Sequence, residues 1–186
     1  SALLSRALGT PCPSMDLRIG CAAGLFALGT AGLFHQAGAK HVLLVGAETF
    51  SKVIPPLSKM AAVSLGDGAG ALVLGKVPHA KLSAVSLDTD GSLAGLVFTD
   101  GALPPTADEV ARGGYLLSGN PEALRQAVHD KYAAAIAAVL ARAKTKSDQL
   151  SHYVPHQTSR DVIAEVCKRL ELPFERAYLN LHRHAN

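Results

Sequence analysis

The stretch Asp16–Gly29 reads DLRIGCAAGLFALG, with one cysteine directly after a glycine and a run of small apolar residues behind it. This pattern predicts a strand-to-helix turn whose first helical residues carry the thiol of Cys21. The unpaired N–H groups and the positive end of a helix dipole stabilise a thiolate there, and a thiolate is the nucleophilic form. Because cysteine is also a common buried packing residue, a reactive Cys21 requires a partner base elsewhere in the chain.

The composition excludes several classes of function. Of the 186 residues, 48% are hydrophobic and 18% charged, and the net charge of +3 is scattered, so no basic footprint for nucleic acid is present. The longest apolar stretches, 25–34 and 42–47, are too short to span a membrane. Three widely spaced cysteines argue against a disulfide framework and for a reducing, cytoplasmic location. The apolar composition also predicts that surface is covered by a partner subunit or by a missing part of the chain.

The order of elements indicates an α/β fold. Helices are expected at 3–8, 21–34, 120–146 and 159–170, and strands at 41–46, 69–74, 81–87 and 177–181. We expect the helix after Cys21 to be buried, and the first two strands to be covered on both faces. The glycine cluster at 65–70 lacks the phosphate-loop spacing and predicts a tight turn, and residues 92–119 predict a long loop over a site or interface.

Three residues with complementary chemistry follow predicted strands. Cys21, His156 and Asn186 each lie just beyond one, and the carboxyl ends of parallel strands meet at the same edge of a sheet. A cysteine nucleophile, a histidine and an amide donor together suit acyl transfer. Taken singly, His156 is equally well interpreted as a structural histidine, and Asn186 is better interpreted as a turn asparagine. A packing role, in contrast, is expected for Cys167, which shares the apolar face of its helix.

Four short motifs give the chain a family resemblance. They are GCAAG at 20–24, LGDGAGA at 65–71, VPHQ at 154–157 and RHAN at 183–186. In this order and spacing they resemble the signatures of β-ketoacyl-acyl-carrier-protein synthase III, within the thiolase superfamily. The resemblance implies a thiolase-like fold of two similar halves in αβαβα layers, with only the central portion present. Residues 1–78 would be the latter part of the first half, and 79–186 the earlier part of the second.

The resemblance also implies the chemistry. Cys21 would be acylated by a thioester and supply half an oxyanion hole, while His156 and Asn186 would stabilise the enolate left by decarboxylation of a malonyl thioester. Substrates would be acyl-CoA or acyl-carrier-protein thioesters, with no cofactor, no nucleic acid and no membrane, in a cytoplasmic homodimer for fatty-acid or polyketide synthesis. We expect N-terminal and C-terminal portions to be missing, including a glycine-rich loop with the second oxyanion donor, so this piece alone should be inert.

Other interpretations stay open at this point. After His-Gln the family commonly continues Ala-Asn-Leu-Arg, whereas this chain has TSRD at 158–161, which leaves the usual substrate contacts there in doubt and suggests a specialised relative. An acyltransferase that passes the acyl group to a non-malonyl nucleophile would keep the same fold. From other classes, His152, His156, His182 and His184 could form a zinc site, or the chain could be a non-catalytic subunit.

Overall fold

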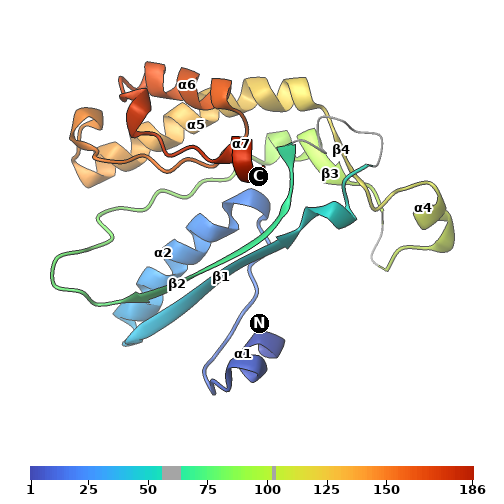
Figure 1. The fold of residues 1–186 in the computed structure, drawn as a ribbon, viewed down its shortest axis with the longest axis horizontal. Helices are drawn as coiled ribbons and strands as arrows, with labels where there is room; N and C mark the ends of the chain where they lie inside the picture. Colours follow the sequence, from blue (N-terminus) through green and yellow to red (C-terminus); the bar gives the residue numbers. More distant parts are fainter. Residues whose placement is uncertain (56–63, 102–103) are drawn as a thin grey trace. The chain divides into compact units, whose positions relative to one another are not determined.

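The computed structural model describes residues 1–55, 64–101 and 104–186 as a mixed helix and strand structure (Figure 1). The helices are α1 (Ala2–Leu8), α2 (Ala23–Gln36), α4 (Ala107–Ala111), α5 (Pro121–Ala143), α6 (Arg160–Arg169) and α7 (Leu181–His184). The strands are β1 (His41–Thr49), β2 (Asp67–Gly75), β3 (Val97–Thr99) and β4 (Leu117–Gly119). Short 3₁₀ turns occur at η1 (Gly20–Ala22), η2 (Phe50–Lys52), η3 (Gly91–Leu96), η4 (Ser147–Gln149) and η5 (Phe174–Arg176).

The chain divides into two compact units. The first contains residues 1–46 and 70–81, and the second contains 47–69 and 82–186. β1 and β2 form one two-stranded sheet, and β3 pairs antiparallel with β4 in another. The division at residues 78 and 79, which we expect from the duplicated fold, stays a prediction because these units rest on contacts within this chain alone.

The helix after Cys21 forms where predicted but is not buried. Of its residues only Ala31 is buried, and the side chains of Leu25 and Leu33 are each 64% exposed. The expectation of a buried central helix is therefore wrong for this chain. The helix is apolar nearly all round, but few described residues are available to cover it. By contrast, the predicted end of α1 is confirmed, because Gly9 caps it in the left-handed conformation at φ 64°.

The strands β1 and β2 also form where predicted, but the described residues do not bury both of their faces. Partly buried and exposed residues alternate along the first half of β1, and most of β2 is exposed, including Leu72 and Val73. The prediction of strands covered on both faces is wrong for this chain. Continuous apolar runs reflect surface that needs burying, and in this chain a two-stranded sheet leaves most of that surface open.

The glycine cluster at 65–70 is not a tight turn. β2 begins at Asp67 and runs through Gly68 and Gly70. The Asp67 carboxylate accepts hydrogen bonds from the backbone N–H and the hydroxyl of Ser51, at 2.8 and 2.6 Å. These bonds, above all that from the hydroxyl, lower the pKa of Asp67. Asp67 therefore ties η2 to the start of β2, a role between distant residues that local turn chemistry does not reveal.

Two further expectations in the middle of the chain are wrong. Residues 81–87 form no strand, and no backbone partner pairs with them in the described part of the chain. Alternating polarity favours a strand only where a neighbouring strand supplies hydrogen bonds. Residues 92–119 are not a long structureless loop, because η3, the β3–β4 pair and α4 lie within them. The capping box of Thr106 and Glu109 fixes the start of α4.

In the second unit α5 and α6 lie side by side (Figure 1). The buried core cluster is built on α6 and Leu172, against partly buried side chains within 150–153 and 170–179. Both helices begin at predicted caps: Asn120 accepts from the N–H of Ala123, and Ser159 from that of Val162. Cys167 is buried in a cluster with Ile163, as predicted from its helix face. None of the helices described is long and apolar enough to cross a membrane.

Candidate active site

Cys21 lies at the start of a helix, as the sequence predicts, but the strand expected before it does not form, because residues 13–19 are irregular. Cys21 is the middle residue of the η1 turn, which continues directly into α2. Gly20 precedes it at φ 57°, a left-handed conformation that glycine adopts without strain. The side chain of Cys21 is exposed, whereas that of Cys167 is buried. The geometry of the turn therefore leaves this sulfur accessible at a helix N-terminus.

His156 follows a short parallel pairing of two chain segments. Tyr153 forms a parallel bridge with Ala177. The N–H of Tyr153 donates to the carbonyl of Arg176 at 2.9 Å, and the carbonyl of Tyr153 accepts from the N–H of Tyr178 at 2.8 Å. The predicted strand at 177–181 is thus reduced to this bridge, because α7 begins at Leu181. The bridge nevertheless directs both segments the same way, toward His156 and Asn186 respectively.

The backbone holds Asn186 on a third segment. Its N–H donates to the carbonyl of Ser64 at 2.8 Å, and its carbonyl accepts from the N–H of Gly66 at 2.8 Å. The preceding residue, Ala185, has φ 54°, which is uncommon for a residue with a Cβ. These backbone bonds fix Asn186 without using its side chain.

The side chains of Asn186 and His156 meet. Nδ2 of Asn186 lies 3.4 Å from Nε2 of His156. Burial lowers the pKa of His156 from its ordinary value of 6.5, because desolvation disfavours the charged ring. A neutral imidazole with its proton on Nε2 and the amide of Asn186 present two N–H donors that are close together. Such a pair suits an oxygen that gains negative charge.

The structure divides the three predicted site residues between its two compact units. Cys21 belongs to the first unit, and His156 and Asn186 belong to the second. The contact between His156 and Asn186 lies within one unit and is therefore defined. The predicted convergence of Cys21 with that pair stays a prediction.

Two residues support this pair although the sequence predicts no functional role for either. Tyr132, on α5, donates from its hydroxyl to the carbonyl of His156 at 3.1 Å, and burial raises the pKa of that phenol. The side-chain amide of Gln157 binds the segment that leads to Asn186. The periodicity of α5 predicts only a packing role for Tyr132, whereas the position of Gln157 directly after His156 is a signal that could have found it.

The residues that depart from the family pattern are used by the fold itself. Ser159 caps α6 through its hydroxyl, and the guanidinium of Arg160 lies 5.1 Å from the ring centroid of Phe174. Thr158 has a buried hydroxyl that finds no hydrogen-bond partner among the residues that the structure describes. Within the same residues no three His, Cys, Asp or Glu side chains cluster to hold a metal ion, so the zinc alternative gains no support.

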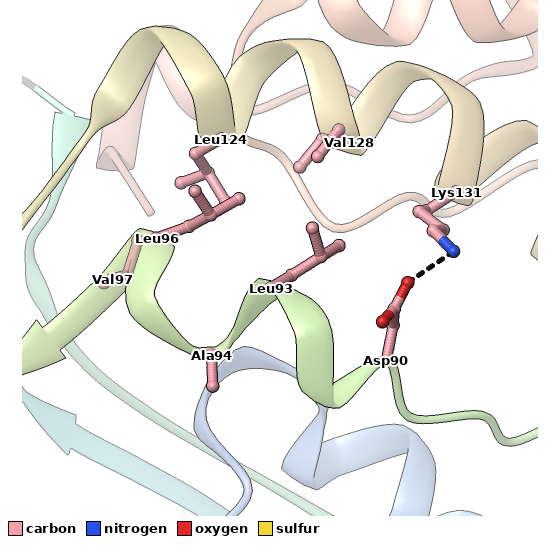
Figure 2. Close-up of a pocket in the computed structure, with 9 residues that line it drawn as sticks. Asp90, Leu93, Ala94, Leu96, Val97, Leu124, Val128 and Lys131 are labelled. Atoms are coloured by element: carbon pink, nitrogen blue, oxygen red, sulfur yellow. Dashed lines mark ion pairs between the residues drawn. The ribbon is translucent and has the colours of Figure 1, made fainter.

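An apolar hollow of about 260 Å³ lies apart from these residues, between η3 and α5 (Figure 2). Leu93, Leu124 and Val128 contribute to its lining. At one side of it Lys131 Nζ and an Asp90 carboxylate oxygen form an ion pair at 2.6 Å. The same carboxylate accepts from the N–H of Ser92, so it also caps η3.

Comparisons with known proteins agree with the motifs. Two family descriptions match: 3-oxoacyl-[acyl-carrier-protein] synthase III over residues 15–91, and the C-terminal part of the same family over residues 140–186. Two curated relatives are both named beta-ketoacyl-[acyl-carrier-protein] synthase III. That of Vesicomyosocius okutanii is 32% identical over all of this chain and 57% of its own length, and that of Paracoccus denitrificans is 35% identical over 92% of this chain and 54% of its own.

A solved structure supports the same assignment. The 3-oxoacyl-(acyl carrier protein) synthase III of Pseudomonas aeruginosa superimposes on all of this chain and on 57% of its own, with a TM-score of 0.89 and 27% identity. The predicted α/β, thiolase-like fold is thereby confirmed. The chain spans a little over half the length of the relatives it matches. By motifs, profile and fold, it belongs to the 3-oxoacyl-[acyl-carrier-protein] synthase III family.

Proposed function

We propose that the protein containing this chain is a condensing enzyme that joins an acyl group to a malonyl thioester. The observation that carries this proposal is the 3.4 Å approach of Asn186 Nδ2 to His156 Nε2. Two neutral N–H donors that lie this close together can both bind one enolate oxygen, and that oxygen carries the charge that a decarboxylating malonyl thioester develops. Plain acyl transfer to an amine or alcohol produces no enolate, so the pair favours condensation.

In the first half-reaction Cys21 takes up the acyl group. Its thiolate attacks the carbonyl of an acyl thioester, a new C–S bond forms, and the C–S bond to the donor breaks, so that the donor leaves as its thiolate. The exposed position of Cys21 in the η1 turn before α2 supports this role. The N-terminal end of a helix favours the thiolate, and the nearby backbone N–H groups stabilise the tetrahedral oxyanion.

In the second half-reaction His156 and Asn186 act on the malonyl thioester. Its carboxylate leaves as CO₂, and the electron pair of the broken C–C bond forms an enolate whose oxygen accepts from His156 and Asn186. The enolate carbon then attacks the acyl carbon on Cys21. A C–C bond forms, the C–S bond breaks, and the Cys21 thiolate is regenerated together with a 3-oxoacyl thioester, so atoms and charge balance.

The substrates and partners follow from this chemistry and from the family. We propose acyl-CoA or acyl-carrier-protein thioesters as substrates, a cytoplasmic homodimer, no cofactor, and a place in fatty-acid or polyketide synthesis. The names of the relatives, which mention an acyl carrier protein, support the carrier-protein substrate.

The test uses the full-length protein, incubated with a panel of acyl-CoA thioesters and examined by intact-mass and peptide mass spectrometry. We expect one acyl adduct, located on Cys21 and absent from Cys21→Ala. Cys12 is the internal control, because it is equally exposed but has no place in the proposed chemistry. Label on Cys12 or Cys167, or no adduct with any thioester, contradicts the proposal.

The second half-reaction is tested with malonyl thioester labelled in its free carboxyl group. We expect the acylated enzyme to release labelled CO₂ and form a 3-oxoacyl product. An enzyme that is acylated on Cys21 but transfers the group to other nucleophiles without releasing CO₂ would be an acyltransferase, and condensation would then be wrong.

A further inference from the structure

The side chain of Gln157 makes four hydrogen bonds to the segment that ends in Asn186. Oε1 accepts from the backbone N–H groups of Asn180 and Leu181, both at 2.9 Å. Nε2 donates to Oδ1 of Asn180 at 2.9 Å and to the carbonyl of Tyr178 at 3.3 Å. A primary amide offers two N–H donors and two acceptor lone pairs, so the capacity of this side chain is fully used.

These bonds replace a cap that α7 does not supply for itself. The N-cap residue Asn180 makes no side-chain bond to the first turn of α7, and the first N–H groups of a helix lack partners within it. Gln157 satisfies those of Asn180 and Leu181 from another segment. The orientation of α7 therefore depends on a residue 24 positions earlier in the chain.

The same bonds continue the pairing of the two segments. Backbone pairing extends from Tyr153 to Ala177 and Tyr178, and then both segments leave the bridge. From there the side-chain amide of Gln157 joins the two segments, up to the point where the side chains of His156 and Asn186 meet. Gln157 directly follows His156 in the chain. The residue that binds the start of α7 is therefore next to the histidine that meets Asn186, beyond the end of α7.

We propose that Gln157 is a positioning residue, whose amide fixes α7 so that the Asn186 amide meets the His156 ring. The proposal rests on the proposed function, because it assigns this geometry to the decarboxylation step. Asn186 lies six residues after the N-cap residue Asn180, and its backbone bonds to Ser64 and Gly66 hold only the end of the segment that is remote from Gln157. Loss of the Gln157 amide shifts the helix and with it the separation of the two donors.

The experiment measures the two half-reactions separately in the full-length enzyme. Gln157→Met removes all four bonds at similar side-chain length, and Gln157→Glu keeps an oxygen that accepts from Asn180 and Leu181. Gln126→Met is the matched control, because Gln126 lies on the exposed surface of α5 and its side chain donates to Glu122 of the same helix. Acylation of Cys21 and release of CO₂ from malonyl thioester are followed, together with the urea midpoint.

We expect Gln157→Met to lower CO₂ release about 100-fold, the order of loss that a 1 Å misplacement of a catalytic group causes. Acylation of Cys21 should stay within about twofold of wild type, because the interactions lost act only in the later step. Gln157→Glu should recover only part of the CO₂ release, because it keeps the oxygen that accepts from Asn180 and Leu181 but loses both N–H donations, to Asn180 and Tyr178. Gln126→Met should change neither half-reaction. Equal losses in both half-reactions, or no loss in either, overturn the proposal.

A spectroscopic measurement decides the role of Gln157 independently of turnover. Long-range ¹H–¹⁵N NMR of the His156 ring nitrogens should change in Gln157→Met in the same direction as in Asn186→Ala, and stay unchanged in Gln126→Met. Ring shifts identical to wild type in Gln157→Met overturn the positioning role. If the wild-type enzyme is not acylated or releases no CO₂, the proposed function fails, while these shifts still report on Gln157.

Discussion

Nδ2 of Asn186 lies 3.4 Å from Nε2 of His156, although 30 residues separate the two in the chain. The backbone of Asn186 is held by Ser64 and Gly66 and not by its own side chain. The amide can therefore be removed with little effect on the loop that carries it.

Asn186→Ala should lower CO₂ release from malonyl thioester by about 10²- to 10³-fold, the usual effect of deleting one donor to an oxyanion. Acylation of Cys21 should be unaffected, since that step develops no enolate. Single-turnover acylation and CO₂ assays on the full-length enzyme measure both. His182→Ala is a suitable control in α7, and a comparable loss in that variant would contradict a specific role for Asn186.

The pH dependence of decarboxylation should follow the neutral form of His156. Burial lowers the pKa of this ring in the folded protein below 6.5, its ordinary value in an unfolded chain. Between the folded and the unfolded pKa, the unfolded chain therefore binds more protons than the folded protein. Decarboxylation should therefore persist below pH 6.5, and stability should fall as the pH drops through this value. Titration of the His156 ring by NMR gives the midpoint directly. A midpoint at or above 6.5 would show that desolvation does not control this histidine.

Ser159→Ala should destabilise the protein by about 1 kcal/mol, because it removes the hydroxyl that caps α6. The affected bond is that from the Val162 N–H, at 3.2 Å. Urea denaturation of the full-length protein measures the change. Ser159→Asp retains a capping oxygen and should stay near wild type; equal losses in both variants would mean that the hydroxyl acts through packing.

Lys131→Met should raise the pKa of Asp90. The pKa of Asp90 is lowered to about 2, and the hydrogen bond from Lys131 is the largest cause. The hydroxyl and the N–H of Ser92 lower it further by their own hydrogen bonds. The stabilising contribution of the pair is complete above the ordinary value of 3.8 and is lost as the pH falls toward about 2.

NMR titration of the Asp90 carboxyl carbon in wild type and Lys131→Met measures this shift. Because Ser92 still donates, the value in the variant should remain below 3.8. Lys168→Met removes a lysine from α6 and should leave Asp90 unchanged. An unchanged titration in Lys131→Met would mean that Ser92 alone determines the charge state.

The elements that the sequence predicts well depend on neighbouring residues. Hydrogen bonds that span only a few residues make the N-caps at Asn120 and Ser159 and the left-handed C-cap at Gly9. The local order of residues therefore predicts them. The failures involve partners that are distant or not included in this chain. Residues 81–87 alternate in polarity and find no strand to pair with among the described residues, and Asp67 in the glycine cluster is held by Ser51 from another element.

The sequence by itself determined the family, the turn that presents Cys21 and the helix caps, because motif order and short-range hydrogen bonds are written in consecutive residues. Only the tertiary structure decided that Gln157 caps α7 and that Asn186 meets His156. Those contacts join residues 24 and 30 positions apart. Their distances depend on how the bridge at Tyr153 and Ala177 aligns two segments, which no local pattern encodes.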